Sequence, residues 1–132
     1  MEPGVRIRLY EAADWTGVWG ILEPVFREGE SYMVDPGIPE AEVRKLWTDH
    51  GGWVHVAKDT AGRIVGTYYL KANYSGPGDH ICNAGFAVHP DARGRGIARM
   101  MGRHALEEAR RLGFEAMQFN AVVSSNTAAV KL

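Results

Sequence analysis

A strand-like run, a turn rich in glycine and arginine, and a helix-like run follow one another between residues 85 and 112. The turn places Gly94 and Gly96 where the helix begins. The first N–H groups of a helix have no intrahelical partner and lie at the positive end of the helix dipole, so they suit an anion that glycines allow to approach. Full positive charges in the same stretch come from Arg93, Arg95 and Arg99. The segment predicts an anion site, and a pyrophosphate is the anion that we expect there.

Two well-known phosphate-binding motifs do not match this turn. A P-loop requires a Gly-Lys-Ser/Thr ending, and the chain has none. A dinucleotide fingerprint requires glycine at position 99, where Arg99 stands, and an acidic residue at the end of the following strand, whereas Glu115 lies at its beginning. The predicted anion site is therefore neither a P-loop nor a dinucleotide-binding fingerprint.

The hydrophobic pattern outside this segment alternates between period two and period three to four, which predicts a mixed α/β domain over residues 1–132. Strands are expected at 5–10, 52–58, 63–71, 80–88 and 116–123. Helices are expected after an Asp14 cap, at 40–49 with Val43, Leu46 and Trp47 inward, and at 96–112. Pro24 is expected to kink or break the first helix near Glu23. The turn at 59–62 predicts a hairpin closed by Gly62.

Composition and charge exclude several functions. The chain of 132 residues has 15 basic and 16 acidic residues and a net charge of -1, so we expect neither a nucleic-acid nor a membrane-surface partner. A single cysteine, Cys82, excludes an intrachain disulfide and is expected to pack as a small apolar side chain. Absence of an apolar span or signal-like segment favours a cytoplasmic location. Four of the five histidines show no paired zinc spacing, so no metal is expected: His55, His80, His89 and His104.

The turn RGRGIA resembles the Arg/Gln-x-x-Gly-x-Gly/Ala signature of the GNAT superfamily of acetyl-CoA-dependent N-acetyltransferases, through Arg93, Gly96 and Ala98. The order of expected elements is similar to that family, and SSNTAAVKL resembles its next segment through Asn126, Ala129 and Leu132. The resemblance therefore covers almost the whole chain. It implies a mostly antiparallel central sheet with helices on both faces, and acetyl-CoA as cosubstrate.

The resemblance also implies how acetyl-CoA is held. The residues expected to contact it around the turn are Ala87, Val88, Arg93, Gly94, Arg95, Gly96, Ile97 and Ala98. The backbone N–H of Val88 is expected to polarise the thioester carbonyl. Gly85 is expected to form a bulge that splays the fourth and fifth strands, so that the pantetheine arm lies between them.

The segments NAGF and FN…N most resemble members of the family that acetylate proline analogues. That resemblance implies that Asn83 orients the acceptor, while Asn120 and Asn126 hold substrate or CoA. The expected proton acceptor is Glu30 or Asp79. Tyr32 and Tyr74 are expected to be pocket walls or, equally, ordinary half-buried aromatic residues. For the asparagines a role in satisfying neighbouring backbone is an equal alternative, and Glu30 is alternatively a surface charge.

The chain departs from the family after Leu132, where a tyrosine acid, a turn and two further strands usually follow. We therefore expect a C-terminally truncated domain whose fifth strand has an exposed edge, covered by a homodimer or by strand exchange. Two functions stay open. The first is acetyl transfer to the nitrogen of a small amine, amino acid or imino acid, and the second is a catalytically incomplete CoA-binding or oligomerising module.

Overall fold

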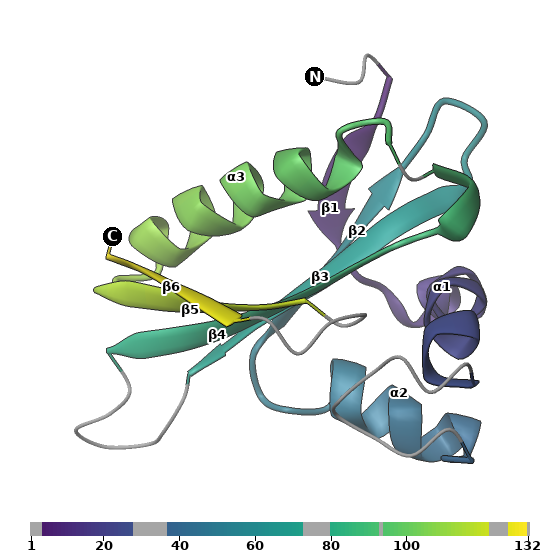
Figure 1. Ribbon diagram of the computed structural model, residues 1–132, viewed down its shortest axis with the longest axis horizontal. Coiled ribbons are helices and arrows are strands. Elements are labelled where there is room, and N and C mark those ends of the chain that lie inside the picture. The colour runs from purple at the N-terminus through teal and green to yellow at the C-terminus, as the bar shows by residue number, and fades with distance from the viewer. Residues whose placement is uncertain (1–3, 28–36, 73–79, 93, 122–126, 132) are drawn as a thin grey trace.

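The structure is a computed structural model that describes residues 4–27, 37–72, 80–92, 94–121 and 127–131, and from residue 120 onward it describes the backbone alone (Figure 1). One sheet has six strands in the order of the sequence: β1 Arg6–Leu9, β2 Trp53–Lys58, β3 Ile64–Ala72, β4 Ile81–Val88, β5 Ala116–Ala121 and β6 Thr127–Lys131. All neighbours are antiparallel except β4 and β5, which are parallel. The mixed, mostly antiparallel sheet is as the family resemblance implies.

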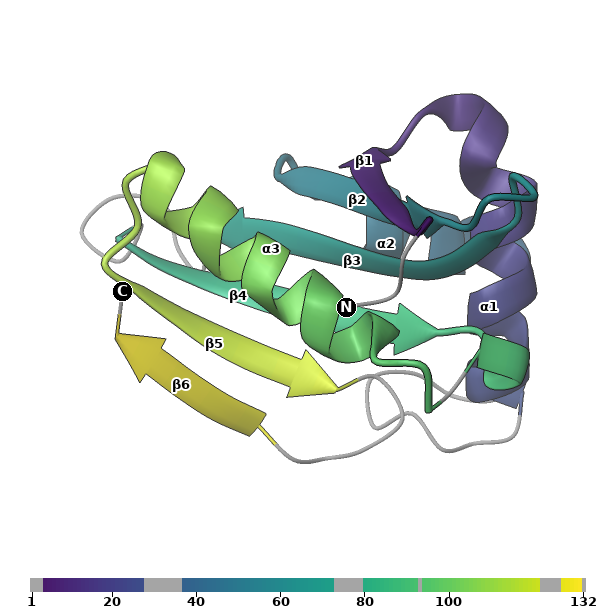
Figure 2. The ribbon, with the colours of Figure 1, turned by 90° about the horizontal axis from the view of Figure 1, so that it is seen from above.

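Helices cover both faces of this sheet, which confirms the expected layers. The helix α3 (Ile97–Arg111) crosses one face, while α1 (Trp15–Arg27) and α2 (Glu40–Thr48) lie on the other (Figures 1 and 2). Short 3₁₀ turns precede α1 at Ala12–Asp14 and follow β4 at Pro90–Ala92. The crossover from β4 through α3 to β5 is what makes that strand pair parallel, and it places the start of α3 just after the end of β4.

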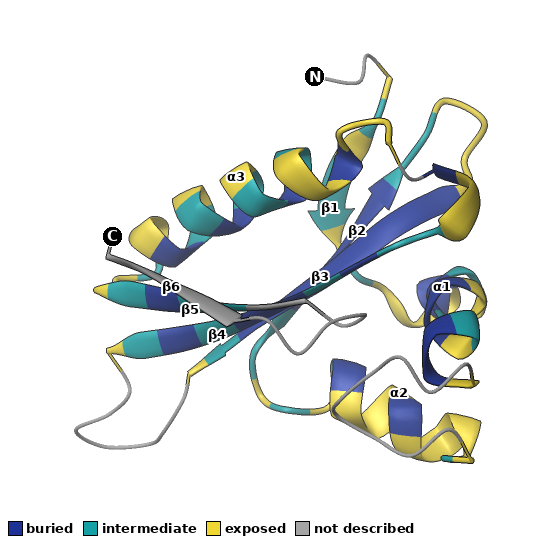
Figure 3. Ribbon diagram, in the orientation of Figure 1, coloured by how far each residue is buried: buried dark blue, intermediate teal, exposed yellow. Residues whose placement is uncertain are grey.

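The alternation of side chains along the strands divides the core into two apolar layers (Figure 3). The layer under α1 and α2 includes Val18, Leu22, Phe26, Val43, Trp47, Val56 and Tyr69. The layer under α3 includes Tyr68, Leu70, Cys82, Ala84, Ile97, Met101, Ala105 and Met117. The indole of Trp47 anchors α2 by donating to Thr67 Oγ1 at 3.0 Å.

A glycine on β3 sets how closely α3 approaches the sheet. A Cβ on Gly66 would lie 2.9 Å from Sδ of Met101 and 3.1 Å from Cγ2 of Ile97. The first two turns of α3 therefore lie directly on β3, with no room for a larger side chain between them. This contact fixes the start of α3 relative to the neighbouring end of β4.

The hairpin β2–β3 is confirmed, with Gly62 at φ +82°. Two predictions for the first helices are wrong: α1 is not broken near Glu23, and Leu46 does not face inward. Helix α1 runs through Pro24 to Arg27; the missing proline N–H would have bonded to the carbonyl of Gly20, which is exposed and can turn to water. Leu46 is 45% exposed rather than inward, because α2 has only nine residues and buries Val43 and Trp47 alone.

The predicted bulge at Gly85 is also wrong. The pairing of β4 with both neighbours is continuous through Gly85, and the register shift in the described sheet lies between Ala57 and Lys58. Gly85 instead lies under the aromatic ring of Tyr69, its partner on β3, where a Cβ would come within 2.6 Å of Cζ. Close packing, not strand bending, requires glycine here.

The expected exposed edge on β5 is not present, because β6 pairs along it from Ala116↔Lys131 to Asn120↔Thr127. The segment that resembles a later part of the family motif therefore forms an edge strand through its residues 127–131. Because β6 covers β5, a homodimer is not needed for that purpose, and the homodimer stays a prediction. Among the described residues, no helix is long and apolar enough to cross a bilayer.

Candidate active site

The turn between β4 and α3 has the backbone geometry that an anion cradle needs. Gly94 and Gly96 have φ of +82° and +77°, a conformation that other residues rarely adopt. The first intrahelical bond runs from the N–H of Met100 to the carbonyl of Gly96, at 3.0 Å, and Gly96 provides no side-chain cap. The N–H groups of residues 97–99 therefore have no partner within the helix and carry its positive end.

These amides adjoin a pocket of about 170 Å³, which is lined by Val88, Ala92, Gly94, Gly96, Ile97 and Ala98. A Cβ on Gly94 or Gly96 would meet no atom within 4 Å, so both glycines border open space. We call the six lining residues the cradle. Five of the eight residues predicted to hold the cosubstrate around the turn are thus brought together.

The other three predicted contacts are placed differently. Ala87 faces the core under α1 and α2, because successive residues of β4 alternate between faces. Arg95 is exposed on the turn, and Arg93 lies outside the described residues. Positive charge beside the cradle comes from Arg99 in the first turn of α3, which is also exposed.

β4 extends beyond the described part of its pairing with β5. The described ladder ends at Phe86↔Ala121, whereas β4 continues to Val88. The N–H of His89 donates to the carbonyl of Val65 on β3, at 2.8 Å. Because N–H groups alternate along a strand, the N–H of Val88 points to the opposite side, where β5 would continue. It lies next to the cradle.

Asn83 lies on the face of the sheet that carries α1 and α2. It pairs with Lys71 on β3 and with Gln118 on β5, so the three residues form one row across that face. Its Oδ1 is buried and has no hydrogen-bond partner among the described residues. Such an orphaned oxygen is costly unless a ligand or water satisfies it.

A second orphaned atom lies on the same face, at a residue that the sequence analysis missed. The ring of His50, just after α2, is 5.1 Å from that of Tyr69, and its Nε2 is buried without a partner among the described residues. Burial and the nearby Lys71 lower the pKa of His50. The ring is therefore neutral, and because Nδ1 accepts from the N–H of Gly52 at 3.1 Å, the proton is on Nε2.

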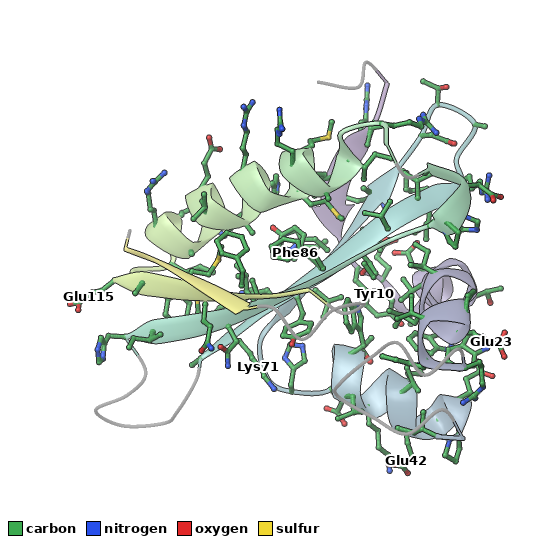
Figure 4. The ribbon with its side chains drawn as sticks, viewed as in Figure 1. Tyr10, Glu23, Glu42, Lys71, Phe86 and Glu115 are labelled. Atoms are coloured by element: carbon green, nitrogen blue, oxygen red, sulfur yellow. The ribbon has the colours of Figure 1, made fainter. Side chains whose placement is uncertain are left out.

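Lys71 adds a positive charge to this group. Its Nζ lies 5.7 Å from the centre of the Tyr69 ring, and the ring of Trp47 meets Tyr69 edge-on at 4.9 Å. Figure 4 shows Lys71 on the side of the sheet toward α2, and Phe86 on the opposite side beneath α3. We call Asn83, His50, Lys71 and Tyr69 the polar cluster. No short sequence motif predicts the polar cluster, because strand pairing brings its members together.

The remaining predicted site residues are Glu30, Tyr32, Tyr74, Asp79 and Asn126, and they lie outside the described residues. Asn120 pairs with Gly85 through the parallel ladder.

Cys82 is fully buried in the layer under α3, as predicted. Burial raises the pKa of its thiol to about 11, which leaves no thiolate for nucleophilic catalysis.

Comparison with known proteins identifies the family to which the chain belongs. Residues 15–132 match the model of the acetyltransferase (GNAT) family. The chain belongs to that family.

Individual relatives agree with this. A GCN5-related N-acetyltransferase from Kribbella flavida is 36% identical, with a TM-score of 0.78 over 89% of this chain and 71% of its own. N-acetyltransferase aca1 of Schizosaccharomyces pombe is 41% identical over 69 residues, which are 52% of this chain and 33% of that protein. The match thus spans about a third of that curated relative. A Sinorhizobium meliloti phosphinothricin acetyltransferase, solved with AcCoA, shares the fold at 23% identity and a TM-score of 0.75, over 88% of this chain and 65% of its own.

Proposed function

We propose that this domain binds acetyl-CoA and transfers its acetyl group to the nitrogen of a small amino acid. The observation that carries the proposal is the cradle, in which the open amides of residues 97–99 adjoin a pocket at the end of β4. Family membership supports the same cosubstrate, because relatives of this fold have been solved with acetyl-CoA. A pyrophosphate in the cradle would accept hydrogen bonds from these amides.

The length of the pantetheine arm decides where the thioester lies. The arm has about thirteen bonds between phosphorus and sulfur, so it extends about 15 Å. Val88 itself lines the cradle, so a thioester at Val88 would require a folded arm. We therefore assign the Val88 N–H to an amide carbonyl of the arm instead of the thioester. The thioester then lies toward Asn83, about 16 Å back along β4.

The polar cluster has the donors and acceptors that an amino acid requires. The Nε2–H of His50 and the Lys71 ammonium suit a carboxylate, while Asn83 Oδ1 suits the N–H of an amine. Two of these three groups are buried and orphaned in the described structure. A ligand with both a carboxylate and an amine provides hydrogen-bond partners for His50, Lys71 and Asn83 together. An amine without a carboxylate provides a partner for Asn83 alone.

The reaction forms a bond between the amine nitrogen and the acetyl carbon and breaks the bond between that carbon and sulfur, releasing the CoA thiolate. The amine must be neutral when it attacks and must then lose a proton. His50 carries its proton on Nε2 and accepts at Nδ1 from Gly52, so it orients substrate and does not accept that proton. Glu30 and Asp79 stay predictions for the base, and a cytoplasmic location stays the expected setting.

Thiol release from acetyl-CoA, measured with matched pairs of acceptors, tests this proposal. We expect alanine and proline to be acetylated and their counterparts without a carboxylate, ethylamine and pyrrolidine, to react at least tenfold more slowly. Asn83→Ala is expected to lower kcat/KM at least tenfold, because the orphaned oxygen is its contact with the amine. Lys71→Met is expected to raise KM for amino acids.

Lys45→Met, on the exposed face of α2, is the matched control and should leave kcat/KM and KM for amino acids unchanged. CoA binding is measured in parallel by calorimetry. Binding with no turnover of any acceptor would contradict the catalytic proposal and support the alternative of an incomplete CoA-binding module. Equal rates for each matched pair would contradict the role of the polar cluster.

A further inference from the structure

A second polar cluster lies on the opposite face of the sheet, beneath α3. It consists of His55 on β2 with His104 and Glu108 on α3. One ligand atom of each residue lies within 4.8 Å of the other two, and the two imidazole rings are 5.1 Å apart. His104 and Glu108 are one helical turn apart, so both project from the same side of α3.

His55 is the buried member of this group. It is 4% exposed, and its Nδ1 has no hydrogen-bond partner among the described residues. Its ring is stacked on that of Tyr68, with 4.6 Å between ring centres. Burial, followed by the nearby His104, lowers the pKa of His55 to about 4. At neutral pH it is therefore the uncharged imidazole that a metal requires.

The surroundings orient the other two residues. His104 Nδ1 lies 2.6 Å from the hydroxyl of Tyr68, which leaves its Nε2 to act as a ligand. Metal-binding histidines commonly hold their second nitrogen in such a hydrogen bond. Glu108 accepts from Arg111, and both of the contacts described for that pair use Oε2, so Oε1 is the oxygen available to a cation.

We propose that His55, His104 and Glu108 form a binding site for a divalent transition metal of the zinc type, with water as the fourth ligand. Two imidazoles and a carboxylate are a common zinc donor set. Tetrahedral zinc places its ligand atoms about 3.4 Å apart, so ligand atoms that now lie up to 4.8 Å apart must approach one another by up to about 1.4 Å. His104 and Glu108 are partly exposed and can make this adjustment.

The site is independent of the proposed function, because it lies across the sheet from the polar cluster and shares no residue with the cradle. Binding would link β2 to α3 and add stability to the folded state alone. Arg111 is a charged group near the cluster, and its contact with Glu108 competes with the metal. No zinc motif is visible in the sequence, because two of the ligands are separated from the third by the whole β3–β4 segment.

Titration of untagged protein with Zn²⁺ by calorimetry, and with Co²⁺ by visible absorption, tests the site. We expect one ion per chain, with the intense absorption of tetrahedral Co²⁺. His104→Ala and Glu108→Gln should each weaken binding at least tenfold. Tyr68→Phe, which removes the hydrogen bond that orients His104, should weaken it roughly ten- to hundredfold. Zn²⁺ should also raise the unfolding midpoint of the wild-type chain but not of His104→Ala.

His89→Ala is the control, because His89 and Asp91 form a surface pair that could hold an ion adventitiously. It should leave the titration unchanged. His55→Ala is avoided because the loss of a buried ring could prevent folding. The proposal is overturned if the wild-type chain binds no ion, if His104→Ala binds as tightly as wild type, or if Co²⁺ gives the weak absorption of an octahedral surface site.

Discussion

Gly96→Val is expected to weaken CoA binding by at least a hundredfold, to the point where calorimetry detects little or none. Gly96 borders open space at the mouth of the cradle, where the phosphate must approach the amides of residues 97–99. A valine would fill that space and cover donors that no other group of α3 replaces. The loss of about 2.7 kcal/mol follows from a hundredfold change in affinity.

Backbone strain alone must be separated from this effect, because Gly96 has a positive φ and any substitution there is strained. Gly62→Val is the matched control: Gly62 has φ +82°, its Cβ would also meet open space, and it lies in the β2–β3 turn. It should lose similar stability and retain CoA binding. Ala98→Leu blocks the cradle from a helical position without such strain, so it should also abolish binding. Normal binding by both cradle variants would contradict the assignment.

Gly85→Ala is expected to destabilise the domain by about 1–3 kcal/mol, a loss typical of an overpacked site. The added methyl would overlap the ring of Tyr69, which is 3% exposed and held edge-on against Trp47. Urea unfolding followed by circular dichroism measures this loss. Gly20→Ala, on an open face of α1, is the control and should stabilise the chain slightly.

The overlap can be tested directly through a double variant. Tyr69→Leu alone should be destabilising because it removes a buried ring, yet it also frees the space that a methyl group at position 85 would need. The two changes together should therefore cost at least about 1 kcal/mol less than the sum of their separate losses. Additive losses would show that Gly85 is required for a reason other than the ring.

Local pattern is sufficient to predict most elements of this fold. The hairpin at Gly62 and the helix after Gly96 are confirmed because turn chemistry and periodicity act over a few residues. The failures involve contacts between distant segments. The bulge predicted at Gly85 is wrong because the sequence does not reveal which ring lies over a strand glycine. The pairing of β6 with β5 likewise depends on segments that must first be brought together.

In the candidate site, too, local features are predicted from the sequence and contacts between distant segments are not. Most of the cradle is one short stretch of chain whose conformation is set by its glycines. The sequence alone therefore identifies most of the residues that form it. The polar cluster takes Asn83 from β4, Lys71 from β3 and His50 from the segment after α2, and the sequence predicts only Asn83 among these three. Its geometry arises from strand register, and its orphaned polar atoms can be recognised only once burial is known.

The most direct test of the proposed cosubstrate site is a titration of ¹⁵N-labelled protein with CoA, followed through the amide resonances. We predict that the largest shifts occur at Gly94, Gly96, Ile97 and Ala98, with a smaller shift at Val88, because these amides surround the bound pyrophosphate and the start of the arm. A groove of about 390 Å³ between β1 and α3 offers a competing location, lined in part by Val5, Ile7 and Arg103. Gly96 borders both locations, so the other amides discriminate between them. Shifts concentrated on Val5, Ile7 and Arg103, with Gly94, Ile97 and Ala98 unmoved, would contradict the assignment.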